Sequence, residues 1–329
     1  MSWKQLTISK CVLADGTIAE VTADNEYSDL FWALTGGGNS FCLLTKFHLR
    51  TFDSPSITLA NPSYGFGEET KSQWMDSVLN YAIDGSSDPK AAIIPVARFA
   101  AGFPGPRYDV TLFRNGNDTK PAIFNDFQGG LLPANNLTTL NRLTMAQFSK
   151  AVLPSFQPGG ASNGLQQRFH VVSTTATREA IEIVHDTFFD YVVSHNLTSL
   201  PHFFVGLAWN AVTTKFVEAS NSGIGCPQGI TEEPQFWVEE AITWGDAADT
   251  PKIEAFVQET NANITAQLAA KGLDVPYIYL NDADPDQLVF QGYPAENVQR
   301  LKEIRSKYDP LRIYTDLMPG GFKVADVEV

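Results

Sequence analysis

Two short stretches of this sequence combine residue types that could hold a cofactor and move a proton. The first is the run Gly36, Gly37, Gly38 and Asn39. Because glycine has no Cβ, such a turn lets backbone N–H groups approach a ligand and donate hydrogen bonds to its phosphate or ring oxygens. The same triplet also suits a tight connection between a helix and a strand. Cofactor contact and a purely structural turn are both open interpretations of these residues.

The second stretch contains Tyr279, Asn281 and Asp282. We expect a strand over 275–280, in which alternation would place Tyr279 and Asn281 on one face and Asp282 on the other. Asp282 could act as a general base if burial holds its pKa near the working pH. The favoured interpretation is that its carboxylate caps the turn 282–285. Tyr279 could also be a core aromatic residue whose hydroxyl is hydrogen-bonded.

Other chemistries have no motif in this sequence. No P-loop, His-Glu-x-x-His, Cys-x-x-Cys or ordered Ser-His-Asp pattern occurs, which removes support for kinase, zinc-enzyme and hydrolase functions. The cysteines Cys11, Cys42 and Cys226 are too scattered to form a metal site or a disulfide framework. We therefore predict no metal. The five histidines carry no catalytic pattern of their own.

The elements around the glycine run follow from local patterns. Apolar spacing predicts a helix over 30–34 before the turn and a strand over 41–49 after it. This order is the reverse of the dinucleotide fingerprint, which needs a strand first. A β-hairpin is expected over 6–21, with Asp15 and Gly16 at its turn. Asp24 or Asn25 is the expected cap of the helix.

The rest of the chain alternates strands and helices without a repeat, after a change to Pro, Ser, Asn and Gly at about residue 54. A helix opens at Thr250-Pro251 and ends at Gly272. This alternation fits an antiparallel sheet covered by helices. We expect strands over 90–99, 108–114, 167–173, 202–209 and 235–244. Three helices are marked by the apolar sets Trp74, Val78 and Ala82, then Leu137, Leu140 and Met145, and then Ile181, Val184, Phe188 and Val192. A closing helix is expected to bury Val298, Leu301, Ile304 and Tyr308.

Motifs at both ends of the chain resemble one family. The run LFWALTGGGNSF at 30–41, shortly after VLADG at 12–16, resembles the berberine-bridge-enzyme-like flavin oxidases of the vanillyl-alcohol-oxidase superfamily. Independently, YLNDA at 279–283, NVQRLKEIRSKYDP at 297–310 and PGGFK at 319–323 are similar to the closing segment of the fungal members. Two motif sets in the right order are more specific than either alone.

The resemblance implies an α+β fold. An FAD-binding lobe of the PCMH type would be built from 1–53 and 273–329, and 54–272 would form a substrate domain with a helix-covered antiparallel sheet. It also implies FAD as cofactor, bound by Gly36, Gly37, Gly38, Asn39 and Asn281, with Tyr279 and Asp282 as catalytic candidates. The sequence departs from the family pattern in two places: Cys42 replaces a glycine, and Asp282 replaces a second tyrosine.

The family resemblance also suggests what the flavin lobe lacks. The Gly-Gly-His-Ser-type loop and the cysteine that attach FAD covalently in many members have no counterpart in this sequence. We therefore expect a truncated chain with an incomplete lobe, weak FAD binding and an unpaired strand edge at 6–12. The terminus shows no signal peptide, although a longer form in this family would enter the secretory pathway.

Composition limits the partners. A net charge of −14 disfavours nucleic acids and anionic membranes, and no apolar run reaches the length of a membrane span. The expected function is an FAD-linked oxidoreductase that oxidises a small alcohol, sugar or secondary-metabolite intermediate by hydride transfer, with O₂ as the second substrate. The alternatives are a flavin-free isomerase or cyclase and a non-catalytic remnant.

Overall fold

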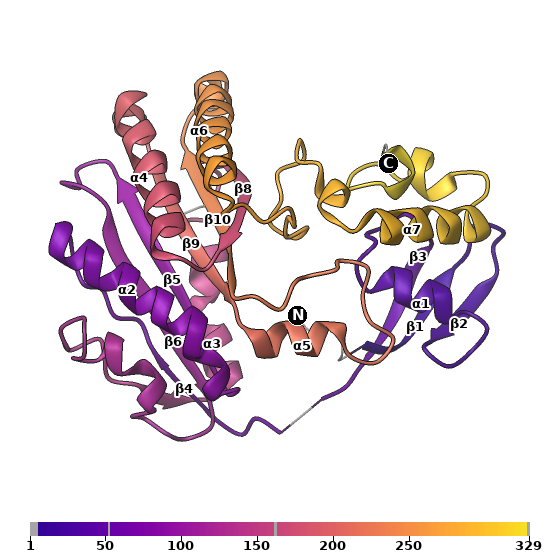
Figure 1. Cartoon of the computed structure of the whole chain (residues 1–329), viewed down its shortest axis with the longest axis horizontal. Helices are drawn as coiled ribbons and strands as arrows, with labels where there is room; N and C mark the ends of the chain where they lie inside the picture. The colour runs from indigo at the N-terminus through magenta and orange to yellow at the C-terminus, as the bar shows by residue number, and fades with distance from the viewer. Residues whose placement is uncertain (1–5, 52, 161–162, 328–329) are drawn as a thin grey trace. The chain divides into compact units, whose positions relative to one another are not determined.

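The computed structural model describes residues 6–51, 53–160 and 163–327. They form two compact units, drawn in Figure 1. Unit 1 consists of the described residues within Met1–Phe52, Thr214–Glu232 and Pro276–Val329, so both ends of the chain lie in it. Unit 2 consists of those within Asp53–Thr213 and Glu233–Val275. Residues 214–232, which the sequence suggested as part of the middle domain, cluster with the ends instead.

Unit 1 contains a three-stranded antiparallel sheet of β1 (Leu6–Val12), β2 (Ile18–Thr22) and β3 (Leu43–Leu49). The strand order is β2-β1-β3. The prediction that 6–12 would be an unpaired edge was wrong, because β3 returns antiparallel beside β1 and leaves it in the centre. The hairpin turn contains Gly16 at φ +86°, a conformation in which glycine pays no steric penalty.

Three α-helices are described in unit 1: α1 (Ser28–Leu34), α5 (Thr214–Asn221) and α7 (Ala295–Tyr308). Short 3-10 or π helices lie at Val289–Gly292, Ile313–Leu317 and Val324–Asp326. The predicted buried side of α7 is confirmed, since Val298, Leu301, Ile304 and Tyr308 are all buried. The expected side-chain cap of α1 was wrong. The N-cap is Tyr27, whose side chain makes no capping hydrogen bond. The Asn25 side chain lies in the preceding turn, where its Oδ1 accepts a hydrogen bond from the Tyr27 N–H at 3.1 Å.

The strand expected over 275–280 does not form. Residues 275–279 have no regular secondary structure, and a turn follows in which Asp282 N–H donates to the Tyr279 carbonyl at 3.1 Å. Pro276 lacks the N–H that a strand ladder needs, which explains why an apolar, β-branched stretch stays irregular. The argument from alternating faces therefore fails for Tyr279 and Asn281.

Unit 2 is built on a seven-stranded sheet in which every pairing is antiparallel. Its strand order is β7-β4-β6-β5-β9-β10-β8. The predicted strands over 90–99, 108–114, 167–173, 202–209 and 235–244 all occur; the last has the predicted ends and the others have shifted ends. The strands are β4 (Ile57–Ala60), β5 (Ala91–Ala100), β6 (Arg107–Asn115), β7 (Asn141–Leu143), β8 (Gln166–Thr175), β9 (Phe204–Val212) and β10 (Gln235–Trp244).

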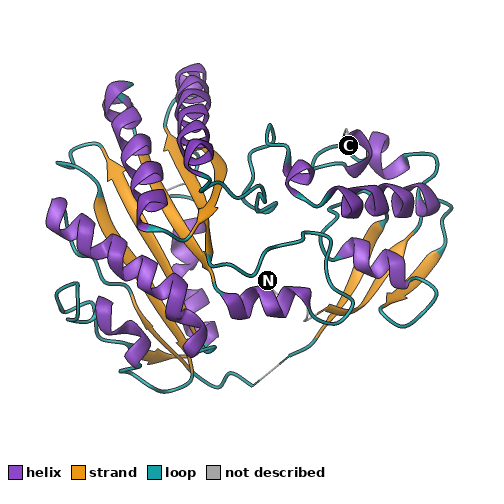
Figure 2. Cartoon of the chain, viewed as in Figure 1, coloured by secondary structure: helices purple, strands orange, loops and turns teal. Residues whose placement is uncertain are grey.

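Helices α2 (Glu68–Asp84), α4 (Arg178–Ser194) and α6 (Thr250–Lys271) cover one face of this sheet, as Figure 2 shows. Their apolar sides and the facing strand residues form one continuous core. The helix suggested by Leu137, Leu140 and Met145 was misplaced. The short helix α3 (Met145–Val152) begins at Met145, where Thr144 and Gln147 form a capping box. Of the helices that the structure describes, none is long and apolar enough to cross a membrane.

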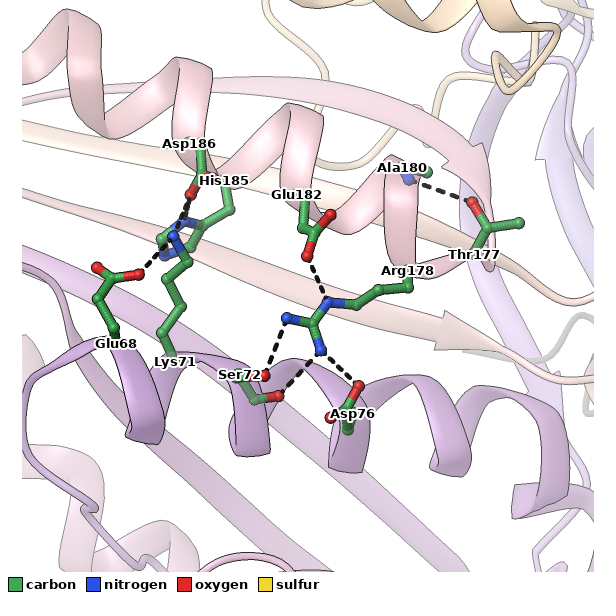
Figure 3. Close-up of polar contacts among 10 residues, drawn as sticks. All are labelled: Glu68, Lys71, Ser72, Asp76, Thr177, Arg178, Ala180, Glu182, His185 and Asp186. Carbon is green, nitrogen blue, oxygen red and sulfur yellow. Dashed lines mark hydrogen bonds and ion pairs between the residues drawn. The ribbon is translucent and has the colours of Figure 1, made fainter.

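A buried histidine joins α4 to the sheet and to α2, and much of its network is drawn in Figure 3. His185 is 2% exposed. Its Nε2 lies 3.1 Å from the Tyr108 hydroxyl, and its Nδ1 lies 2.7 Å from Asp186 Oδ1. Lys71 of α2 pairs with Asp186 at 2.9 Å and with Glu68 at 3.2 Å. Burial holds the pKa of His185 below its usual value, even though the bond to Asp186 acts in the opposite direction.

This lowered pKa predicts a pH-dependent stability. The unfolded chain binds a proton at His185 below about pH 6.5, while the folded chain does not until a lower pH. The free energy of unfolding should therefore fall with decreasing pH below about 6.5, by at most about 1.4 kcal/mol per pH unit from this residue. Urea unfolding of the wild type and of His185→Gln between about pH 5 and 7.5 tests this. An equal slope in the two proteins would contradict it.

Candidate functional site

The glycine turn is closely surrounded by other parts of unit 1. A Cβ on Gly37 would lie 2.6 Å from Phe41, 2.8 Å from the Ala33 carbonyl and 2.8 Å from Leu301 of α7. Gly38 adopts φ +70°, and the Gly37 N–H donates to the Ala33 carbonyl at 2.7 Å. The turn thus ends α1 tightly enough for α7 to pack directly against it. A structural need for glycine is established at Gly37.

Two carbonyl groups at the start of this turn, those of Thr35 and Gly36, accept hydrogen bonds from side chains. The buried Tyr293 hydroxyl donates to the Gly36 carbonyl at 2.8 Å. Gln228 Nε2 donates to the Thr35 carbonyl at 3.1 Å. The N–H groups of Gly38 and Asn39, in contrast, donate to no residue in the described part of the chain. The turn therefore contains two adjacent N–H groups without an acceptor in that part of the chain, and cofactor contact by them stays a prediction.

The side chain of Asn39 holds the carboxyl-terminal segment in place. Its Nδ2 donates to the Gly320 carbonyl at 3.2 Å, and its Oδ1 accepts from Lys323 Nζ at 3.0 Å. Lys323 also donates to the Tyr314 carbonyl at 2.8 Å. Burial lowers the pKa of this lysine. Because its side chain is engaged in this way, Asn39 is available to a ligand through its backbone.

A cavity of about 510 Å³ lies within unit 1 against the glycine turn. Its wall is mainly apolar and aromatic, with a few polar groups, which is the usual character of small-molecule sites. The apolar lining consists of Leu34, Leu44, Phe47, Tyr277, Tyr279, Leu280, Tyr293 and Phe322. The remaining lining residues are Gly36, Gly38, Asn39, Gln228, Asn281 and Gly321. These residues come from three stretches that are far apart in the sequence.

The structure brings together most of the residues singled out from the sequence. Gly36, Gly38, Asn39, Tyr279 and Asn281 all line this cavity, and Asn281 Nδ2 donates to the Tyr279 hydroxyl at 2.8 Å. Their functional roles remain predictions.

The other two predicted residues are not in the cavity lining. Gly37 faces the packing between α1 and α7, and Asp282 is half-buried outside the lining. Burial raises the pKa of the Asp282 carboxyl. Cys42, the departure from the family pattern, is buried and also outside the lining.

Gln228 is the wall residue that sequence reasoning missed. It is 6% exposed, and its Oε1 is buried without a hydrogen-bond donor among the described residues. Leaving a buried polar atom unpaired costs about 1–3 kcal/mol, so such an atom calls for an explanation. A signal was present in Gly225 and Gly229, which bracket the residue and both adopt positive φ. Two glycines so close together indicate a segment with a specific backbone conformation.

Replacing Gly37 tests the crowding at the turn. Gly37→Ala should destabilise the protein by about 1–3 kcal/mol, because the added methyl group must displace Phe41, Leu301 or backbone. Gly105→Ala is the matched control, since a Cβ there meets nothing within 4 Å. Thermal and urea unfolding measure both. A Gly37→Ala protein as stable as the control would contradict the packing argument.

Comparisons with known proteins place this geometry in context. No protein-family model matches the chain. It is 28% identical over 326 residues to the FAD-dependent monooxygenase prx3 of Penicillium roqueforti, covering 95% of this chain and 61% of that protein. The chain therefore spans less than two thirds of that relative's length. The relatives favour neither a flavin-free isomerase or cyclase nor a non-catalytic remnant.

Solved structures agree over nearly the whole chain. Berberine-bridge-enzyme-like 1 of Physcomitrella patens has a TM-score of 0.70 at 13% identity, covering 99% of this chain and 66% of that one. Xylooligosaccharide oxidase of Myceliophthora thermophila has a TM-score of 0.69 at 18% identity, covering 99% and 67%. The chain has the fold of the berberine-bridge-enzyme-like FAD oxidases, and its relatives in sequence include fungal FAD-dependent monooxygenases.

Proposed function

We propose that this protein is an FAD-linked oxidoreductase that oxidises a small alcohol, sugar or secondary-metabolite intermediate by hydride transfer to the flavin. The observation that carries the proposal is the cavity in unit 1. There, the glycine turn that ends α1 meets Tyr279 and Asn281, which lie about 240 residues away in the sequence. Two motifs that had suggested one family thus share one site.

The chemistry of the cavity fits the ring system of a flavin. Isoalloxazine is flat and largely apolar, and carries hydrogen-bonding atoms along its edge. The aromatic walls suit its faces, and a volume of about 510 Å³ lies within the range of ligand sites. The N–H groups of Gly38 and Asn39 could donate to ring oxygens or nitrogens, and Gln228 Oε1 could accept from a ring N–H. These groups would hold the ring.

FAD, when bound, supplies the two-electron acceptor that an alcohol oxidation requires, and O₂ accepts the electrons in turn. The protein supplies the proton chemistry and the orientation of the substrate. We propose that Tyr279, a residue of the cavity wall whose hydroxyl oxygen accepts a hydrogen bond from Asn281 Nδ2, acts in its phenolate form as the base that takes the hydroxyl proton of the substrate. Asp282 does not line the cavity, so we assign it no direct role in this proposal.

The substrate class follows from the character of the site and from the relatives. A mainly aromatic cavity with a few amide and hydroxyl groups suits a neutral organic molecule better than a phosphorylated or highly charged one. The similar enzymes include an oxidase of xylooligosaccharides and a fungal monooxygenase. The first acts on xylooligosaccharides, by its name. Among small molecules, sugars and secondary metabolites are therefore the first classes to test.

The cofactor is tested first, without a substrate. Residues 1–329 are purified without added flavin, and FAD is titrated while its fluorescence and visible spectrum are recorded. Quenching that saturates supports the proposal. A yellow protein that already carries near-stoichiometric flavin supports it more strongly and contradicts the sequence-based expectation of weak binding. No spectral change at any FAD concentration would overturn an FAD-linked function for this chain.

A substitution then tests the role of Tyr279. In the FAD-loaded protein, Tyr279→Phe should slow anaerobic bleaching of the flavin by substrate about 10²–10⁴-fold, the usual contribution of a positioned acid or base. Its FAD affinity should change little. Tyr64→Phe is the matched control, because its hydroxyl bonds the Phe127 carbonyl and does not line the cavity. Equal bleaching rates in the wild type and Tyr279→Phe would remove Tyr279 from the mechanism.

A further inference from the structure

Gln228 is built into the wall of the cavity by its own segment. Asn297 Nδ2 of α7 donates to the Pro227 carbonyl at 3.1 Å, and Asn221 Nδ2 donates to the Ile230 carbonyl at 3.3 Å. Gly229 adopts φ +62° where a Cβ would overlap Pro294. These contacts fix the backbone on both sides of Gln228. Its side chain therefore has a defined position rather than a mobile one.

The Gln228 amide group is oriented by its neighbours. Its Nε2 donates to the Thr35 carbonyl, which can only accept, so the opposite orientation would bring two oxygens together. A Cβ on Gly36 would overlap this amide, so the absence of a side chain at Gly36 is what admits it. The Oε1 atom is then left buried and unpaired in a residue that lines the cavity.

The unpaired hydrogen-bonding groups of the lining residues indicate which groups a complementary ligand would carry. Gln228 Oε1 is an acceptor, and the N–H groups of Gly38 and Asn39 are donors. The complementary ligand edge carries one N–H donor together with acceptor atoms, attached to a flat body that suits aromatic walls. The imide edge of oxidised isoalloxazine has this composition, because its N3–H is the single ring donor between the O2 and O4 acceptors.

We infer that Gln228 is a positioning residue for the flavin, and that its Oε1 accepts the hydrogen bond of the flavin N3–H. This inference rests on the proposed FAD-linked function, but it concerns binding of the ring and not turnover. It also gives the segment 214–232 a role in the site. This segment interrupts unit 2 in the sequence and contributes one residue, Gln228, to the cavity lining.

Blocking the N3 position of the ligand tests the inference without any enzymatic activity. The probes are lumiflavin and 3-methyllumiflavin, and their affinities are measured by fluorescence quenching. The wild type should bind 3-methyllumiflavin roughly tenfold more weakly, the effect of one lost hydrogen bond. Gln228→Leu should bind lumiflavin roughly tenfold more weakly than the wild type and should discriminate between the two probes less than about twofold.

Matched variants separate hydrogen bonding from general damage to the cavity. Leu280→Ala changes the apolar wall, so it should weaken both probes alike and keep their ratio. If Gln228→Leu does not fold, Gln228→Met, which keeps a similar length, is used in its place. A second measurement needs no variant: in lumiflavin labelled with ¹⁵N at N3, the bound N3–H should exchange with water more slowly than the free one.

The outcomes divide clearly. Equal affinity of the wild type for the two probes, unprotected N3–H exchange in the bound probe, or no binding of lumiflavin would each overturn the role of Gln228. The same tenfold ratio in Gln228→Leu would also overturn it. FAD-dependent oxidation without discrimination at N3 would leave the proposed function intact while this inference fails. If the protein discriminates between the two probes at N3 but no substrate reduces its flavin, the role of Gln228 is supported while the proposed function fails.

Discussion

The lack of free space around the glycine turn is the constraint on which unit 1 depends. Gly37 lies between Phe41, the last turn of α1 and Leu301 of α7, so the helix, the turn and the closing helix can pack only if residue 37 has no side chain. Once this packing is fixed, the carbonyls of Thr35 and Gly36 point to donors that the fold supplies. The N–H groups of Gly38 and Asn39 have no such partner among the described residues. A single packing requirement therefore both closes the unit and leaves donors at the cavity.

Unit 2 shows that an unusual buried polar residue need not mark a site. Both ring nitrogens of His185 have partners, Tyr108 and Asp186, and Lys71 neutralises the carboxylate that the ring contacts. A buried network that is satisfied in this way rigidifies the core and fixes how α2 and α4 meet the sheet. Gln228 differs, because one atom of its buried amide remains unpaired beside a cavity. Gln228 thus combines an unpaired buried atom with a place in the cavity lining, and His185 has neither.

Local sequence patterns predicted the elements whose stability depends on their own apolar faces. Helices α2, α4, α6 and α7 and the long strands of unit 2 follow from hydrophobic spacing, since each buries one side against a broad core. The failures occur where tertiary contacts decide. The apolar stretch after Val275 stays irregular, because Pro276 cannot donate to a strand ladder. Leu140 is buried and Leu137 is exposed, but neither lies in a helix.

For the candidate site as well, local motifs could be predicted from the sequence and long-range contacts could not. The glycine run and Tyr279 with Asn281 were visible because each is a local motif, and the resemblance to a family joined them. Gln228 was not visible, because nothing in the sequence near residue 228 indicates that it will meet Thr35. That contact exists only after the segment 214–232 has joined unit 1. Residues that complete a site from a distant loop are therefore the ones that a single sequence hides.

The construction of the cavity has a consequence for the energetics of the protein. Every lining residue belongs to unit 1, yet the lining comes from three separate parts of the chain. Unfolding of unit 1 must therefore destroy the cavity, whereas the core of unit 2 contributes no lining residue. A ligand present at about 100 times its Kd adds about 2.7 kcal/mol to the stability of the state that binds it. Because that state is folded unit 1, occupancy of the cavity is coupled to the docking of residues 214–232 and of the carboxyl-terminal segment onto the glycine turn.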